Sequence, residues 1–253
     1  MLIKTKNQQY GFDFYYDSND DFVGKQIAAA NYEPYESKLF LENLKPNSIL
    51  FDVGANIGYY SLLASSKILD GEIISFEPYL PIFEVLNENI KLNNIRNVHT
   101  YNTAIANYKG SSKLFLASDN QGDHRLYHTP GRNHVDVPVI SIDLFIAESQ
   151  IVPTIIKIDT QGFDYYVLLG LENLLQSSGE LIIFTEFWIY GNIQSGVDSI
   201  RYFDFLRYHF SDIRYIDEST NTSYEVDFDF IKNECLKYNN FNHVNLFCKK
   251  LSQ

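Results

Sequence analysis

One acidic residue and a pair of glycines stand where the chain changes from a strand pattern to a helix pattern. The segment FDVGANIGYYSLLAS, residues 51–65, places Asp52, Gly54 and Gly58 at that change. Glycine permits a tight turn and a close approach to the backbone. The G-x-x-x-G spacing differs from the G-x-G-x-x-G of dinucleotide binders, which brings a pyrophosphate onto a helix N-terminus. Asp52 would repel a pyrophosphate, but it would suit a ligand that carries an ammonium group.

Glu77 is the second acid, and it follows the next apolar run, in the segment ISFEP. An acid at this place can accept hydrogen bonds from both hydroxyls of a ribose. A nucleoside that carries an amine and no phosphate is S-adenosylmethionine (SAM), so Asp52 and Glu77 together point to SAM. Each acid alone has a plainer explanation. Asp52 could be a surface acid beside a structural turn, and Glu77 could be a solvated acid at a strand end or a helix cap before Pro78 and Pro81.

Carboxyl groups also end two later apolar runs, at Asp159 in TIIKID and at Glu186 in FTEF. A hydroxyl acceptor must be held in line with the methyl group and must lose a proton. The two carboxylates could form half of a divalent-cation site, or one could be a base that the other orients. The alternative for Asp159 is hydrogen bonding within its own turn. Lys157, which lies between isoleucines, is expected to pair with an acid and to be structural.

A polar segment, DNQGDHRLYHTPGRN, supplies further candidates for the acceptor side. His124 would be a reasonable base because the unperturbed pKa of histidine lies close to working pH. Arg125 could bind a carboxylate or a phosphate of the acceptor. Trp188, which follows Glu186, stands where a wall of the acceptor site is expected. A solvated loop without function would contain much the same residues.

The elements that must position these residues alternate between apolar, β-branched runs and amphipathic helical segments. This alternation predicts an α/β fold with a mainly parallel sheet whose two faces are covered. The expected strands cover residues 48–53, 71–78, 98–105, 154–159, 180–187, 213–217 and 243–249. Residues 107–142 are expected to form an inserted β-hairpin or flap, and residues 31–44 an N-terminal helix. We expect residues 31–253 to form one domain after a preamble at 1–30.

Four segments in order, FDVGANIGYYSLLAS, ISFEP, YNTAIANYKG and IIKIDTQGFDYYVLLGLENLL, resemble the FkbM-type methyltransferases. The similarity runs from about Tyr32 to about Trp188. It implies the Rossmann-like class I methyltransferase fold, with a seven-stranded, mostly parallel sheet and SAM across the ends of its first strands. Gln161 and Asp164 stand where the family usually has glutamate, so a role that needs an acid at position 161 is in doubt.

The resemblance also implies roles for individual residues. The expected contacts to the methionine part and the backbone are Asp52, Gly54, Asn56 and Gly58, and the expected ribose acid is Glu77. Asn102 and Ala104 are expected to border the adenine, although a strand-end asparagine and a packing alanine would look the same. The implied activity is transfer of a methyl group from SAM to a hydroxyl of a small molecule or sugar. A non-catalytic nucleoside-binding or scaffolding protein of the same fold is the alternative.

The composition makes some classes of binding partner improbable. A net charge of −12 makes DNA and long RNA poor candidates, since binding to them depends largely on Lys and Arg. Cys235 and Cys248 lack zinc-site spacing and are expected to be reduced thiols of a cytoplasmic protein. Because no apolar run is long enough for a signal peptide or a membrane span, we expect a soluble protein. A homo-oligomer is compatible with the sequence.

Overall fold

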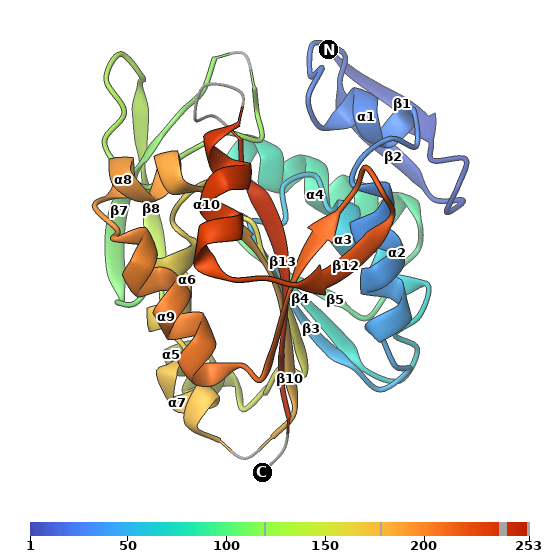
Figure 1. The fold of residues 1–253 in the computed structure, drawn as a ribbon. Helices are drawn as coiled ribbons and strands as arrows, with labels where there is room; N and C mark the ends of the chain where they lie inside the picture. Colours follow the sequence, from blue (N-terminus) through green and yellow to red (C-terminus); the bar gives the residue numbers. More distant parts are fainter. Residues whose placement is uncertain (119, 178, 238–241, 252–253) are drawn as a thin grey trace.

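The structure is a computed structural model that describes residues 1–118, 120–177, 179–237 and 242–251. Within these ranges, the largest element is an eight-stranded sheet with helices on both sides (Figure 1). Its strands, in spatial order, are β12 (Thr222–Glu225), β11 (Asp212–Asp217), β13 (Val244–Lys250), β10 (Leu181–Phe187), β9 (Ile155–Ile158), β3 (Ile49–Val53), β4 (Glu72–Phe76) and β5 (Val98–Tyr101). The strands from β10 to β5 are parallel, whereas β13 is antiparallel to both of its neighbours.

This architecture confirms the predicted α/β class with a mostly parallel sheet. The described sheet has one strand more than the seven expected, because β12 pairs with the outer edge of β11 in antiparallel register. The predicted strand at 98–105 is wrong in its second half. Residues 98–101 form β5, but β6 (Ala104–Ile105) leaves the main sheet and joins a separate three-stranded sheet.

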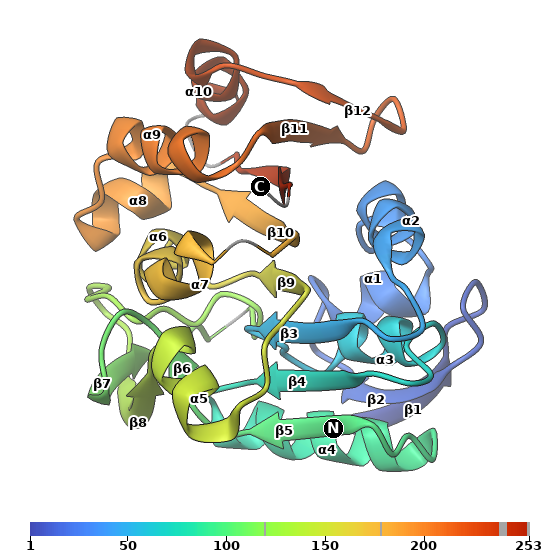
Figure 2. The same cartoon turned by 90° about the horizontal axis from the view of Figure 1, so that it is seen from below.

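Helices cover the two faces of the main sheet in two groups (Figure 2). One group is α2 (Pro34–Asn43), α3 (Tyr59–Ser65) and α4 (Leu80–Leu92). The other is α5 (Ile142–Ser149), α6 (Asp164–Leu169), α7 (Glu172–Gln176), α8 (Ile189–Ser195), α9 (Ser199–His209) and α10 (Phe228–Leu236). None of the helices in the described ranges combines the length and the apolar composition that crossing a membrane requires.

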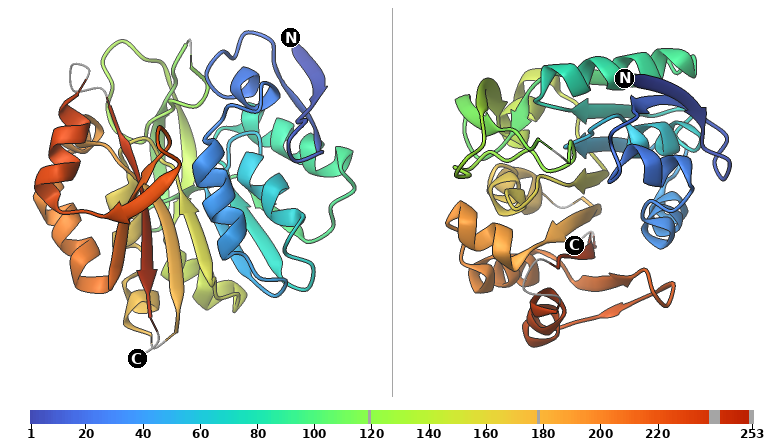
Figure 3. Two further views of the ribbon diagram at one scale, coloured as in Figure 1. Left: turned by 45° about the vertical axis from the view of Figure 1, so that its right-hand side comes forward. Right: turned by 90° about the horizontal axis from the view of Figure 1, so that it is seen from above.

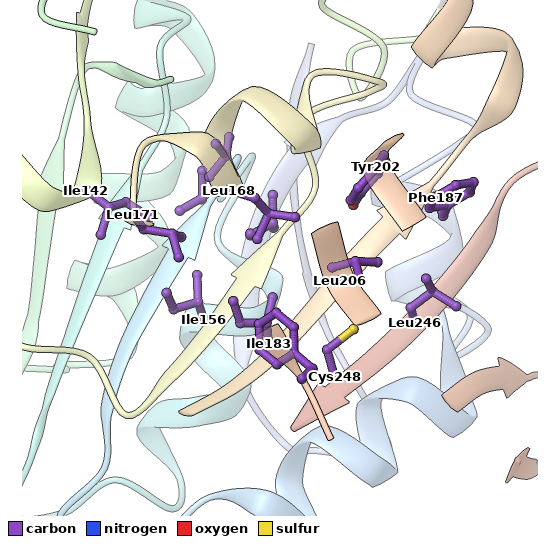
Figure 4. Packing of buried hydrophobic residues seen from close by; sticks show 14 of the residues in the cluster. Ile142, Ile156, Leu168, Leu171, Ile183, Phe187, Tyr202, Leu206, Leu246 and Cys248 are labelled. Atoms are coloured by element: carbon purple, nitrogen blue, oxygen red, sulfur yellow. The ribbon is translucent and has the colours of Figure 1, made fainter. Parts of the chain in front are cut away.

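The core beneath the second group shows why the strands are so apolar. Ile156 of β9 and Ile183 of β10 are fully buried, and they pack with Leu168 of α6 and Leu206 of α9 (Figure 4). The opposite faces of the same strands belong to another buried cluster, which includes Ile155. A strand that is buried on both faces reads as a continuous apolar run rather than as an alternating one. Burying a polar side chain costs free energy, so such a strand places polar residues mainly at its end.

Residues 1–30, the expected preamble, form a hairpin of β1 (Leu2–Lys6) and β2 (Asp13–Asp17), followed by α1 (Gly24–Ala28). The hairpin is fastened to α4 through Asn89, whose side chain is fully buried. Its Oδ1 accepts a hydrogen bond from the backbone N–H of Tyr15 (2.6 Å), and its Nδ2 donates to the carbonyls of Tyr15 (3.1 Å) and Ile57 (2.8 Å). One amide thus joins the N-terminal hairpin to the turn that follows β3.

Residues 107–142 contain the expected hairpin, formed by β7 (Gly110–Phe115) and β8 (His134–Ile140) in antiparallel register. β6 pairs in parallel with β8 and completes the small sheet. The loop between β7 and β8 stands at the same end of the main sheet as the N-terminal segment (Figure 3). It is the end at which the parallel strands terminate, so both additions stand above the place where ligands bind in open α/β sheets.

Candidate functional site

The turn after β3 requires glycine at two positions. Gly54 and Gly58 have φ values of 82° and 95°, in the left-handed region that favours glycine. A Cβ at Gly54 would lie 2.0 Å from the carbonyl oxygen of Asp159, and a Cβ at Gly58 would lie 2.6 Å from Leu86 of α4. The glycines therefore allow the turn to pack tightly against the end of β9 and against α4. Gly54 also lines the cavities described below, so the packing role and the expected ligand contact coexist there.

Glu77 is held at the end of β4 by two backbone donors. Its Oε2 accepts from the N–H of Asn56 (3.0 Å) and its Oε1 from the N–H of Tyr79 (2.8 Å). Each oxygen keeps a second lone pair, which a ribose hydroxyl can use. Burial raises the pKa of Glu77 to about 7. Asn102, expected to border the adenine, instead donates from Nδ2 to the carbonyls of Glu77 and Pro78 (2.9 Å each), and so fixes this loop.

Two adjoining cavities occupy this end of the sheet. The first, of about 280 Å³, is acidic, and its lining includes Glu33, Asp52, Asp159 and Glu186. The second combines Glu77 and Ala104 with an apolar lining made by Phe76, Ile105, Leu114 and Leu126. The residues common to both linings are Gly54, Asn56, Gly122, Asp159 and Gln161. An apolar slot beside a carboxylate suits a nucleoside, and an acidic cavity suits the cationic end of SAM, so the two together fit this donor.

Two acids of the first cavity, Asp52 and Glu186, are buried, whereas Asp159 is half-buried, and the three are incompletely paired. Asp52 accepts a hydrogen bond from the Ser61 hydroxyl of α3 (2.5 Å), and burial raises its pKa to about 6. Asp159 Oδ1 accepts from the side-chain amide of Gln161 (2.7 Å). Glu186 Oε1 has no hydrogen-bond partner among the described residues, and its Oε2 lies 3.7 Å from Nδ1 of His243. Burial, followed by the neighbouring carboxylates, raises the pKa of Glu186, and burial also raises that of Asp159.

Lys157 is the cation that partly offsets these acids. Its Nζ lies 2.8 Å from Oε1 of Glu36, and both side chains are almost fully buried. This confirms the expectation that Lys157 pairs with an acid. The same ammonium lies 4.8 Å from the ring centroid of Tyr60, which lines the cavity. Lys157 itself lines the cavity, so the lysine of this structural pair also forms part of the cavity wall.

Glu33 is a cavity residue that the sequence did not single out. It precedes Pro34 and has φ 43° and ψ 56°, a left-handed conformation that is costly for a residue with a side chain and is disfavoured before proline. Its Oε2 accepts a hydrogen bond from the hydroxyl of Tyr60 (2.6 Å). Strain of this kind persists only where the surroundings over-determine the backbone, and it often accompanies function. The sequence feature that could have indicated Glu33 is an acidic residue directly before the proline that begins a helix.

His124 lies on the nucleoside side. It lines the second cavity and not the first, and its ring meets that of Tyr79 edge-on with centroids 4.8 Å apart. Nδ1 accepts a hydrogen bond from the N–H of Ala117 (3.1 Å), which places the proton of the neutral ring on Nε2. Burial, and then the guanidinium of Arg132, lowers the pKa of His124 to about 4. Its ring lone pair is thus already engaged, and the geometry does not support His124 as the base.

Arg125 and Trp188 contact each other rather than the cavities. Asp123 holds the Arg125 guanidinium through two hydrogen bonds of 2.6 and 2.9 Å, and the guanidinium lies 4.9 Å from the ring centroid of Trp188. Neither side chain lines the two cavities. The predicted acceptor contacts of both residues therefore lack support in this geometry, because Arg125 is already neutralised and Trp188 is buried.

The possible cation site at Asp159 and Glu186 also gains no support. Among the residues that the structure describes, no group of three or more His, Cys, Asp or Glu side chains is placed to hold a metal ion.

An open sheet of this order, with a nucleoside-type cavity at the ends of its first strands, defines the class I SAM-dependent methyltransferase fold. A solved structure described as the complex of aTrm5 and tRNALeu shares this fold, with a TM-score of 0.50 and 12% identity over 99% of this chain and 53% of that one. The methyltransferase FkbM domain model matches residues 52–217. The chain belongs to the FkbM methyltransferase family.

Two curated relatives are methyltransferases. The hexuronic acid methyltransferase AglP of Haloferax volcanii is 27% identical over 172 residues, which are 64% of this chain and 62% of AglP. Methyltransferase 1 of Beauveria bassiana is 25% identical over 151 residues, which are 50% of this chain and 59% of that protein. The matches thus span about three fifths of the length of each relative.

Proposed function

We propose that the protein transfers a methyl group from SAM to a hydroxyl oxygen of a sugar or another small molecule. The observation that carries the proposal is the continuity of the two cavities through Gly54, Asn56 and Asp159. A donor held by Glu77 in the second cavity can extend toward the acids of the first. The likeness to the hexuronic acid methyltransferase AglP supports a sugar as the acceptor.

When bound, SAM supplies an electrophilic methyl group, and the residues of the chain supply orientation and proton acceptance. Glu77 would hold the ribose, while Asp52 and the turn after β3 would hold the methionine part. Glu186 lines the first cavity and its Oε1 has no partner within the described ranges, so we assign to Glu186 the role of accepting the proton of the acceptor hydroxyl. Its raised pKa makes it a stronger base when it is ionised.

The charge of the first cavity also bears on the acceptor. Four carboxyl side chains line it, and the lysine that faces them is already paired with Glu36. A carboxylate on the acceptor would be repelled by these charges in a medium of low dielectric. We therefore propose an uncharged hydroxyl compound, in contrast to the hexuronic acid in the name of AglP.

Calorimetry and turnover on the full chain test the proposal. We expect binding of SAM and of its product S-adenosylhomocysteine (SAH), no binding of NAD, and SAH release with neutral sugars rather than with uronic acids. Glu186→Gln should slow transfer by about 10²–10⁴-fold with little change in SAH affinity. Glu180→Gln, at the opposite end of β10, is the matched control and should transfer normally. Absence of SAM and SAH binding at millimolar concentration would contradict the proposed function, and a preference for uronic acids would contradict the acceptor class.

A further inference from the structure

The loop between β7 and β8 forms part of the nucleoside side of the site. Gln121, Gly122 and His124 of this loop line the second cavity together with Leu114 of β7. The loop is joined to the glycine turn, since Asn56 Nδ2 donates to the carbonyl of Gln121 (3.5 Å). The insertion is therefore in contact with the element that also positions Glu77.

One polar atom of this loop is buried without a partner. Nε2 of His124 has no hydrogen-bond partner among the described residues, although the atom is shielded from solvent. The N–H of Ala117 occupies Nδ1, so Nε2 carries the proton and is an unpaired donor. A buried donor that makes no hydrogen bond costs free energy, and each such group in a folded protein needs an explanation. A ligand that brings an acceptor atom to the second cavity would provide one.

Several other polar groups of this cavity already make hydrogen bonds. Both oxygens of Glu77 accept backbone hydrogen bonds and can only accept more, which suits ribose hydroxyls. The hydroxyl of Thr103 donates to the carbonyl of Pro138 (3.0 Å), and the amide of Gln161 donates to Asp159. The ring nitrogens of adenine are acceptors, so they need donors that Glu77 cannot supply. His124 offers a neutral donor beside the apolar lining that suits the base.

We infer that His124 recognises the adenine base of SAM, and that its Nε2–H donates a hydrogen bond to a ring nitrogen of that adenine. The inference rests on the proposed function, and it assigns to the insertion a role in donor recognition in place of the predicted role as a base. The lowered pKa of His124 agrees with it, because a neutral ring at pH 7 keeps one donor and adds no charge beside an uncharged base. His124 is then a residue for binding and specificity, and it takes no part in the proton transfer.

Calorimetric binding of SAH and of its 1-deaza, 3-deaza and 7-deaza analogues tests this contact in the full chain. Each analogue replaces one ring nitrogen by a C–H group and so removes one acceptor. The unmodified protein should bind one analogue about 5- to 30-fold more weakly than SAH. His124→Asn can keep the hydrogen bond from Ala117 through its Oδ1 while it loses the Nε2 donor. This variant should bind SAH more weakly by a similar factor, and the penalty for that one analogue should vanish.

Two further variants separate recognition from structure. His124→Gln can place an amide donor near the position of Nε2, and it should keep SAH affinity within about threefold. His128→Asn changes an exposed histidine of the same loop and should bind all four ligands as the unmodified protein does. Unchanged SAH affinity in His124→Asn, or a deaza penalty that persists in it, would overturn the inference. Failure of the unmodified protein to bind SAH would instead overturn the proposed function on which it rests.

Discussion

At the scale of single residues, Glu77 is the side chain on which donor binding should depend most. Glu77→Ala removes the acceptor of both ribose hydroxyls, and we expect it to weaken SAH binding by about 1.5–3 kcal/mol, because hydrogen bonds to a charged group are the stronger kind. Isothermal titration calorimetry measures the difference directly. Glu72→Ala alters an acid at the other end of β4 and serves as the control. Equal affinities in Glu77→Ala and the unmodified protein would remove Glu77 from the ribose site.

The sequence could indicate those site residues that stand at the end of a single predicted strand. Glu77 and Asp159 end apolar runs, and strand ends meet at one edge of a parallel sheet, so their convergence was predictable. Glu33 reaches the same cavity from the start of α2, and no periodic pattern shows where a helix start will dock. Arg125 and Trp188 were expected to contact the acceptor. Instead the two side chains contact each other, although they are more than sixty positions apart in the sequence. Choice of side-chain partners depends on tertiary packing, which composition and spacing do not encode.

At the scale of elements, the strand and helix pattern was predictable because burial on both faces of the sheet leaves a continuous apolar run. The run at 98–105 also looked like one strand, yet it divides between two sheets. Asn102 stands at the division, where its amide is bound to the carbonyls of Glu77 and Pro78. A side chain that fastens its own strand end to a neighbouring loop breaks the strand without changing the apolar pattern. β12 was missed because TSYE is short and largely exposed.

Asn89 gives a prediction at this scale, because it connects α4, the N-terminal hairpin and the turn after β3. Asn89→Ala would leave a part-buried backbone N–H of Tyr15 and a buried carbonyl of Ile57 without this partner, which we expect to lower the free energy of unfolding by about 2–4 kcal/mol. Chemical denaturation measures this loss. SAH affinity should also fall, since Ile57 lies in the turn that lines the first cavity. Glu88→Ala, on the exposed side of the same helix, should change neither quantity. A variant at Asn89 with unaltered stability would show that the hairpin is not held by this amide.

At the scale of the whole molecule, the site concentrates acids in a chain that already carries a net charge of −12. Burial raises the pKa of Asp52 to about 6 and those of Glu77 and Asp164 to about 7. Each of these groups binds its proton more tightly in the folded chain than in the unfolded chain. As pH rises through the interval between the unfolded and the folded pKa, the unfolded chain releases its protons first, so the free energy of unfolding falls. The cationic donor proposed here would relieve the same repulsion when it binds.

This linkage predicts that the ligand-free protein is less stable at pH 8 than at pH 6.5. His124 has the opposite effect on stability: because burial lowers its pKa to about 4, it makes the free energy of unfolding rise with pH. Most of this rise is complete once the pH passes the ordinary histidine pKa of 6.5. Above that pH the carboxyls with a raised pKa dominate, namely Glu77 and Asp164 at about 7 and Glu36 at about 8, and we expect the melting temperature to fall by about 2–6 °C. The double variant Glu77→Gln, Asp164→Asn should weaken the dependence, because neither amide can ionise, while Glu36 and Glu186 still contribute. Scanning calorimetry at pH 6.5, 7.2 and 8 checks both expectations. A melting temperature that rises over this interval would mean that the buried acids are already balanced by cations in the folded chain.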